Sequence, residues 1–291
     1  MKGKDLKSAS GRLASALLLG LFFVFIIIPF VTILLTAFKT NPEIVDMPNR
    51  TLYHRLFPDS WTNFSNLVNV WTGNTISQMG LPFWRSLVNS FIVLIVTIVP
   101  GLALALTAAY SFAKFKFPGK EIAYFLFLGM LMIPTEMTSI PLYMMVSRAR
   151  LVNTYIGLMV PSFMSAFGTF LLRSAMEPIP ASYIEAGRVD GAGEFWIFSR
   201  IIVPMVQPFI VTFLVIKSVW TWNDFFWPFL VVTRGEMRTL TLALNRFITD
   251  IAQYWGEVMA AVMISIVPLL IIFVAFNSNI KTGLMNTGIK G

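Results

Sequence analysis

The chain of 291 residues contains no cysteine and a single histidine, His54. Without cysteine it can form neither disulfide bonds nor thiolate metal sites, and this absence says nothing about the redox compartment. The sequence also lacks an H-E-x-x-H pattern and any histidine within a hydrophobic run. A metalloprotease or a histidine-assisted serine hydrolase within the membrane therefore has no residues to use.

Charged residues are scarce as well. They make up 12% of the chain, against about 25% in soluble domains. Hydrophobic residues make up 56%, and the mean hydropathy is +0.74. This is the composition of an integral membrane protein. The net charge is +8. The basic residues that produce it are expected to mark the cytoplasmic side of the membrane rather than a surface that binds nucleic acid.

Six hydrophobic runs are long enough for a helix to cross the bilayer, which takes about 20 apolar residues. Four of them carry no charge, at residues 13–38, 86–113, 151–172 and 258–280. Two contain charges: the run 122–145 includes Glu136, and the run 206–231 includes Lys217 and Asp224. The sequence thus predicts an all-α integral membrane protein with six transmembrane helices in a single domain, 1–291. The first run is expected to be retained as an anchor, because it is too long for a signal-peptide core.

The distribution of Lys and Arg predicts the orientation. With the N-terminus inside, twelve of them fall in inside segments and nine in outside segments, which are longer in total. This bias places both termini and the loop 174–204 in the cytoplasm.

The loop 174–204 contains the polar sequence Glu185-Ala186-Gly187-Arg188-Val189-Asp190-Gly191, followed by Ile201, Val203 and Pro204. Taken locally, Pro180 suits a first helical turn, and Ser182 with Glu185 has the spacing of a capping box. Asp190-Gly191 reads as a tight turn. The expected structure is a short helix, a turn and a second helix. Its apolar residues suit a knob that inserts into a partner: Ile184, Phe195, Trp196 and Phe198.

These spacings resemble the signature loop of the membrane subunits of binding-protein-dependent ABC importers. In that family the loop contacts the ATPase subunit. Gly187 stands where the family usually has Ala, and Val203 where it usually has Leu. The resemblance assigns ATPase coupling to Glu185, Ala186, Gly187, Asp190, Gly191, Ile201 and Pro204.

Further patterns resemble the sugar-transporting branch of the same family. They are Ile133-Pro134-Thr135-Glu136 with Ile140-Pro141-Leu142, Trp222-Asn223-Asp224-Phe225 with Pro228, Thr239 to Leu244, and Gly283 to Gly291. The match covers roughly residues 85–291, the expected importer core, and is most similar to the maltose-type six-helix permease. It implies the type I importer permease fold.

The resemblance also implies partners. The chain has no G-x-x-x-x-G-K-[ST] phosphate loop for binding ATP, so a separate ATPase must supply the free energy for transport. We expect a second permease subunit in a heterodimer, two ATPase subunits that bind ATP and Mg, and an extracytoplasmic solute-binding protein. No cofactor is expected in this chain. Closure of the ATPases would pull on residues 181–204 and rock the helices. The tail from Lys281 to Gly291 either touches the ATPases or is a disordered end.

Ionisable residues within a membrane are costly and usually face a cavity or a partner. Lys217 and Glu136 either pair with polar groups on neighbouring helices, including each other, or line the pathway. In the second case Lys217 would favour an anionic substrate such as a uronate oligosaccharide. Asp224 lies nearer the outer interface and is expected to be structural. The candidate pathway residues are Lys217, Glu136, Trp222 and Asn223. The aromatic residues around them could stack on sugars or form an interfacial belt.

The expected function is the membrane-spanning subunit of an ATP-driven importer in the bacterial inner membrane, carrying a saccharide. An oligosaccharide is the expected form, and its charge is open. The alternative is an ABC permease for a non-sugar solute such as a peptide or a phosphonate. An uncoupled channel would need no docking loop.

Overall fold

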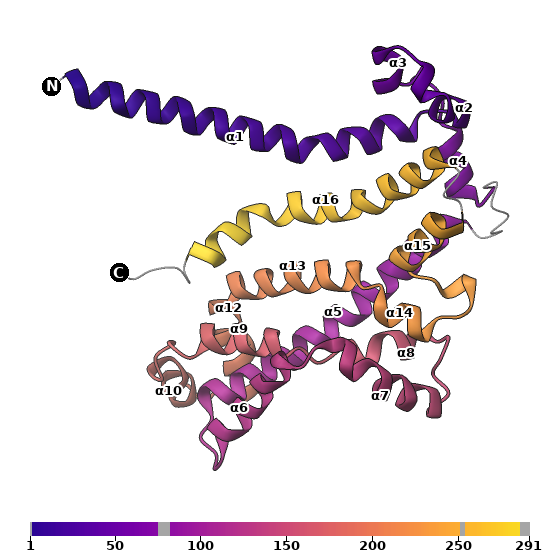
Figure 1. The fold of residues 1–291 in the computed structure, drawn as a ribbon. Helices are drawn as coiled ribbons and strands as arrows, with labels where there is room; N and C mark the ends of the chain where they lie inside the picture. The colour runs from indigo at the N-terminus through magenta and orange to yellow at the C-terminus, as the bar shows by residue number, and fades with distance from the viewer. Residues whose placement is uncertain (1, 75–81, 251–253, 286–291) are drawn as a thin grey trace. The chain divides into compact units, whose positions relative to one another are not determined.

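The computed structural model describes residues 2–74, 82–250 and 254–285. Within those ranges every regular element is helical and there is no strand (Figure 1). Among the described residues, three helices are long and apolar enough to cross a membrane. They are α1 (Lys2–Ala37), α5 (Phe83–Lys114) and α16 (Trp255–Met285), whose apolar stretches run over Ala14–Ala37, Phe83–Lys114 and Trp255–Val274.

Three further spans are bent pairs of helices. In the first, α6 (Lys120–Gly129) and η2 (Met130–Met132) meet α7 (Thr135–Arg148) at 100°. In the second, α8 (Tyr155–Met159) and η3 (Val160–Ser162) meet α9 (Ala166–Met176) at 41°. In the third, α11 (Glu194–Ile197), the π-helix η4 (Phe198–Ile202) and α12 (Val203–Met205) meet α13 (Gln207–Asn223) at 78°. Each pair counted as one span, the described chain has up to six, which confirms the expected fold class. In the third pair, only α13 lies within the hydrophobic run predicted at 206–231.

The runs 122–145 and 151–172 were expected as continuous helices, and the structure breaks both. Pro134 has no N–H to donate, and a proline disfavours the helical conformation of the residue before it. Accordingly, Ile133 is extended, with φ −87° and ψ 118°. The run 206–231 also holds two helices, because α13 ends at Asn223 and α14 (Phe226–Val231) follows.

The described chain divides into two compact units. The first comprises residues 1–83 and 244–266. It contains α1, the short helices α2 (Asn41–Val45), η1 (Met47–Asn49), α3 (Leu52–Leu56) and α4 (Ser65–Thr72), and the start of α16. Asn66 secures the end of α1, because its Nδ2 donates to the carbonyls of Ala37 and Lys39, each at 2.8 Å. Asn69 Nδ2 donates to Glu257 Oε1 at 3.1 Å.

The second unit comprises residues 84–243 and 267–291. It holds α5 to α14, with α10 (Ser182–Val189), then η5 (Gly235–Met237) and the first residues of α15 (Leu240–Asp250). Helix α13 packs on α9, and α14 packs on α7 and α8. Gly168 of α9 makes the first contact possible, because a Cβ there would collide with the ring of Phe213.

The main hydrophobic core of this unit is formed by α5, α9 and α13 together with residues of the segment between α9 and α13. Its buried side chains include Leu106 of α5, Leu172 of α9 and Phe213 of α13. Ile184 of α10 and Ile197 of α11 belong to the same core. The polar loop predicted at 174–204 is therefore packed as part of the helix bundle. Of the predicted C-terminal tail, residues 281–285 continue α16, and residues 286–291 lie outside the described ranges.

Candidate functional site

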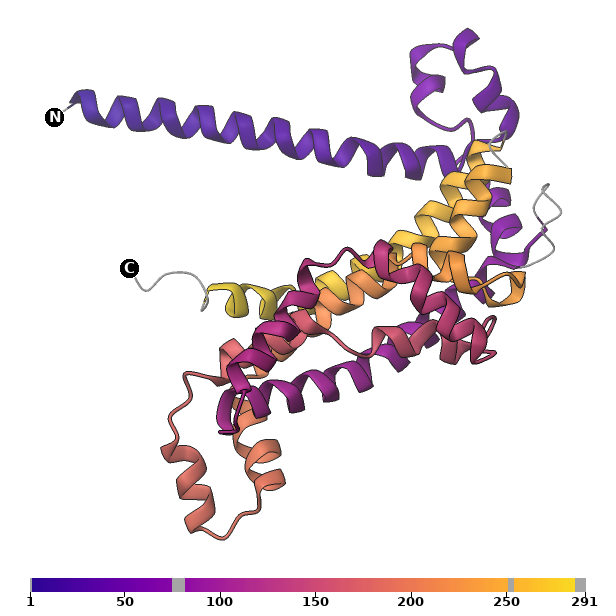
Figure 2. The same ribbon diagram turned by 60° about the horizontal axis from the view of Figure 1, so that its bottom comes forward.

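Residues 182–204 form a helical hairpin, with α10 side by side with α11 to α12 (Figure 2). The turn between its arms ends α10 in a Schellman motif: Ala192 N donates to Gly187 O at 2.9 Å, and Gly191 N to Arg188 O at 3.0 Å. Gly191 has φ +79°, the left-handed conformation that this position requires. The Asp190-Gly191 pair predicted as a turn is thus the C-terminal cap of a helix.

Gly187 lies buried where the two arms of the hairpin approach. A Cβ at this position would lie 3.1 Å from Ile197 Cγ1 and 3.1 Å from Ile201 Cδ1. The missing side chain therefore lets α10 sit directly on the second arm. Ile201, predicted from the motif alone, is one of the two residues that fill this contact.

An ion pair joins the arms across the turn. Arg188 Nε donates to Glu194 Oε1 at 2.7 Å, and Tyr110 of α5 donates to Glu194 Oε2 at 3.5 Å. The hydrogen bond to Glu194 raises the pKa of Arg188, so the guanidinium stays charged. Both partners are about half exposed, so the pair fixes geometry more than it adds stability.

The base of the hairpin is tied to α5 and α6 by two cations that sequence reasoning missed. Arg173 of α9 stacks over the ring of Tyr124 at 3.7 Å, and its Nε donates to Phe112 O at 3.3 Å. Its other contacts are salt bridges to Glu177 at 3.2 Å and Glu121 at 3.6 Å. Lys114 Nζ caps the chain after α9 by donating to the carbonyls of Glu177 and Ile179. Only the i,i+4 spacing of Arg173 and Glu177 could have signalled this cluster.

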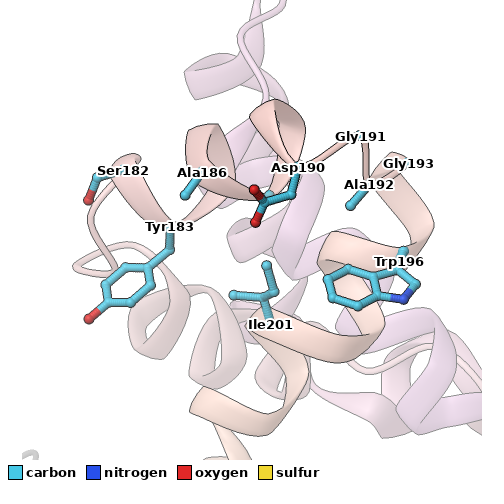
Figure 3. A pocket seen from close by; sticks show the side chains of 10 residues that line it. Ser182, Tyr183, Ala186, Asp190, Gly191, Ala192, Gly193, Trp196 and Ile201 are labelled. Carbon is cyan, nitrogen blue, oxygen red and sulfur yellow. The ribbon is translucent and has the colours of Figure 1, made fainter.

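The outer face of the hairpin is hollowed and apolar. A cavity of about 950 Å³ is lined by Ser182, Tyr183, Ala186, Gly187, Asp190, Gly191, Ala192, Gly193, Trp196 and Ile201. Figure 3 shows Tyr183 and Trp196 across this hollow from one another, with Asp190 and Ile201 between them. Phe195 and Val189 beside it are 80% and 87% exposed. So much apolar surface at the tip of a hairpin is typical of a surface that another protein covers.

The hollow brings together five of the seven predicted coupling residues; Glu185 and Pro204 do not line it. Glu185 is exposed, and no hydrogen bond or salt bridge to its side chain occurs within the described part of the chain. The capping box expected at Ser182 and Glu185 does not form, because α10 begins one residue earlier, with Ala181 as its N-cap. Pro180 precedes that cap. Pro204 is exposed in α12, just before the 78° bend.

A second cavity, of about 680 Å³, lies within the same unit among the bent spans. It is lined by residues of η2 and α7, of the turn between η3 and α9, and of α13 and α14. The polar lining residues are Thr135, Thr138, Ser139, Ser162, Lys217, Thr221, Asn223 and Asp224. Trp220, Phe226 and Trp227 supply aromatic surface.

The predicted pathway residues fall in three different places. Lys217 and Asn223 line this cavity. Glu136 is exposed in the first turn of α7 and is not among the residues that line the cavity. Lys217 does not pair with Glu136, because its Nζ donates to Ser162 O at 2.8 Å. Trp222 is buried, with its ring 5.1 Å from that of Phe91. Sequence reasoning missed Ser162 and Thr138, which have no motif to mark them.

Comparisons with known proteins agree with the geometry. The family described as "Binding-protein-dependent transport system inner membrane component" matches residues 101–284. The arabinooligosaccharides transport system permease protein AraQ of Halalkalibacterium halodurans is 28% identical over 271 residues, covering 93% of this chain and 94% of that protein. The sn-glycerol-3-phosphate transport system permease protein UgpE of Shigella flexneri is 27% identical over 224 residues, covering 76% and 79%.

Two solved structures share the fold. One is a chain of a bacterial ABC transporter involved in the import of the acidic polysaccharide alginate. It has a TM-score of 0.80 at 22% identity and covers 94% of this chain and 97% of its own. The other is a chain of the bacterial alginate ABC transporter in complex with an alginate pentasaccharide-bound periplasmic protein, with a TM-score of 0.60 at 16% identity, covering 94% and 95%. At these identities the structural similarity confirms the importer permease fold but does not identify the substrate of this chain.

Proposed function

Because this chain belongs to the family of binding-protein-dependent transport system inner membrane components, we propose that it carries a saccharide across the membrane as one subunit of an ATP-driven importer. A member of this family is a membrane-spanning transport component rather than an enzyme. An oligosaccharide is the substrate form that we propose.

The packing of the 182–204 hairpin is the observation that carries the proposal. Its outer face is apolar and hollowed, while Ile184 and Ile197 are buried in one core with α5, α9 and α13. A partner that moves the hairpin therefore also moves the membrane-spanning helices, since packed cores shift as rigid bodies. We propose that the ATPase subunit docks on this hairpin. Glu185 makes the polar contact with the ATPase, and the hollow makes the apolar contact.

The assembly that we propose has a second permease subunit, two ATPase subunits and an extracytoplasmic solute-binding protein. ATP and Mg are bound by the ATPases. The solved transporter that holds a periplasmic protein supports the last of these partners. We also propose that both termini lie in the cytoplasm, on the side of the hairpin, as the Lys and Arg distribution indicates.

A saccharide is favoured over a peptide because the relatives and structural neighbours handle sugars or a polyol phosphate. AraQ is named for arabinooligosaccharides, and two solved neighbours are named for alginate. UgpE is named for sn-glycerol-3-phosphate, so a small phosphorylated polyol is the second candidate. Lys217 and Asn223 are the candidate pathway residues that line the second cavity, of about 680 Å³, which we call the inner cavity.

The test is the ATPase activity of the complex reconstituted with its binding protein. The panel contains neutral and acidic oligosaccharides, sn-glycerol-3-phosphate and a peptide mixture. We expect stimulation by one class of oligosaccharide and none by the peptides. Stimulation by sn-glycerol-3-phosphate alone would make a phosphorylated polyol the substrate in place of a saccharide. Stimulation by peptides alone would refute the proposal.

A further inference from the structure

The inner cavity is built where three helical spans are interrupted. Its walls come from the start of α7, the turn between η3 and α9, and the junction of α13 with α14. Figure 1 shows these segments close together, with α14 beside α7 and α8. Its volume of about 680 Å³ lies within the range of ligand pockets, about 300–1,000 Å³. Interrupted helices expose backbone polar groups within a membrane protein only where they line a cavity or are capped.

Lys217 caps one of these interruptions. Its Nζ donates to the carbonyl of Ser162, at the end of η3, at 2.8 Å. An ammonium group has three N–H donors, and this bond uses one of them. The side chain is buried and lines the cavity, so its remaining donors are available to a ligand there.

Asp224 brings the opposite charge to the same cavity. Its Oδ1 accepts a hydrogen bond from Trp227 N at 3.4 Å. Neither Asp224 nor Lys217 is in a salt bridge in the described ranges, although the two charges act on each other. The polar lining otherwise consists of hydroxyl and amide groups. The formal charge of the cavity lining is therefore zero.

A flat aromatic surface completes the lining. Trp220 is 53% exposed, and its ring makes a T-shaped contact with that of Phe167, with the ring centroids 5.2 Å apart. Asn223 donates through Nδ2 to Val219 O at 2.9 Å, which leaves its Oδ1 as an acceptor. A face that is apolar beside an edge of donors and acceptors matches a pyranose ring, whose C–H face is apolar and whose rim carries hydroxyl groups.

We propose that this cavity is a saccharide-binding subsite of the chain in which Lys217 and Asp224 offset each other. Lys217 donates to sugar hydroxyls, Asp224 accepts from them, and Trp220 stacks on the ring. This inference rests on the proposed function and deepens it. Lys217 alone would favour a carboxylate, as the sequence suggested, but Asp224 cancels that preference. The subsite therefore recognises the hydroxyl groups of a sugar unit and does not select for its charge.

The absence of cysteine makes the charge balance measurable in the assembled complex. Thr138→Cys places one thiol of this chain in the cavity lining, and Ser60→Cys provides a matched thiol on an exposed loop. The readout is the ratio of labelling rates with an anionic and a cationic methanethiosulfonate reagent, followed on this chain by mass spectrometry. We expect Lys217→Met to shift the ratio at position 138 about tenfold toward the cationic reagent. Asp224→Asn should shift it about tenfold toward the anionic one.

The double variant Lys217→Met with Asp224→Asn should return the ratio close to its starting value, which also controls for a disturbed fold in either single variant. The ratio at position 60 should not respond to any of these changes. If neither single variant moves the ratio at position 138, the charge balance is refuted.

Sugar occupancy is tested separately by protection. Saccharide-loaded binding protein should slow labelling at position 138 relative to saccharide-free binding protein, and leave position 60 unchanged. Stimulated ATP hydrolysis without protection would overturn the subsite while the importer function stands. If no saccharide stimulates hydrolysis in the wild type, the proposed function fails first and the subsite falls with it.

Discussion

Gly187 shows how one missing side chain shapes the docking hairpin. The space above it is filled by Ile197 and Ile201, each 3.1 Å from where a Cβ would stand. Both contacting atoms belong to side chains rather than to the backbone: Ile201 Cδ1 is the end of its side chain, whereas Ile197 Cγ1 lies next to the Cβ of a buried residue. The family usually places Ala here, and this geometry explains how either residue can be accommodated.

We predict that Gly187→Ala is close to neutral for thermal stability of the complex. The helical interior gains about 1 kcal/mol from replacing Gly by Ala, and the two isoleucines must move by a few tenths of an ångström. Gly187→Leu adds several methylene groups to the same contact and should cost about 1–3 kcal/mol. The melting temperatures of both variants in detergent test this. Equal melting temperatures would show that α10 does not pack as described.

Arg173 is the residue on which the base of the hairpin depends. We predict that Arg173→Ala lowers the stability by about 2–3 kcal/mol, because it removes the stacking on Tyr124 and leaves Phe112 O without its donor. Arg173→Lys should recover only part of this, since a lysine lacks the planar group. Thermal unfolding of the three proteins is the measurement. Full recovery by lysine would reduce the role of Arg173 to its charge.

Lys217 marks what a sequence can and cannot reveal about a single residue. Its charge within a hydrophobic run is visible in the sequence and correctly indicates a polar environment. Its partner, the carbonyl of Ser162, is a backbone atom 55 residues away that is exposed only by a helix break. No side-chain pattern records such an atom, and so the expected alternative of a pair with Glu136 could not be decided beforehand.

At the scale of an element, the end of α10 is the feature that sets the shape of the hairpin. We predict that Gly191→Ala destabilises the hairpin by about 1 kcal/mol, because φ +79° is unfavourable for any residue with a Cβ. Gly193→Ser is the matched control: Gly193 also has open space around it, its φ is −72°, and serine is a favourable N-cap for α11. Limited proteolysis within residues 182–204 should be faster in the first variant only. Equal rates for the two variants would contradict the Schellman cap.

The spans also show why proline is an uncertain guide to helix ends. Pro134 lies in the break of a 100° bend, whereas Pro29, Pro100 and Pro268 lie inside continuous helices. In a membrane, neighbouring helices and side chains can satisfy the backbone groups that a proline frees. Whether a helix breaks therefore depends on its neighbours, which one sequence does not contain. The hydrophobic runs predicted the number of spans, and packing decided which are bent.

At the scale of the whole molecule, the orientation in the membrane can be tested without a background of native thiols. We predict that Ser60→Cys reacts with a membrane-impermeant maleimide in intact spheroplasts. Ser174→Cys, in the loop 174–204 but outside the docking hairpin, should react only after permeabilisation, because this loop is on the cytoplasmic side. Both positions are exposed, so a difference reports sidedness rather than burial. The opposite pattern would invert the proposed topology and remove the hairpin from the reach of an ATPase.

The central claim is that the 182–204 hairpin couples ATP hydrolysis to transport, and Glu185 tests it most directly. Its side chain is exposed, and it has no hydrogen bond or salt bridge within the described residues, so Glu185→Ala should leave the fold intact. Asp46→Asn is a control at another exposed acid, outside the hairpin and its base, where asparagine keeps the acceptor for Asn49 Nδ2.

The measurement is saccharide uptake and stimulated ATP hydrolysis in proteoliposomes that hold the full complex. Truncating a central contact costs about 2 kcal/mol or more, equivalent to about thirtyfold in affinity for the ATPase. The account predicts that Glu185→Ala loses both activities at ATPase concentrations that saturate the wild type, while Asp46→Asn retains them. Full uptake and stimulation in Glu185→Ala would contradict it.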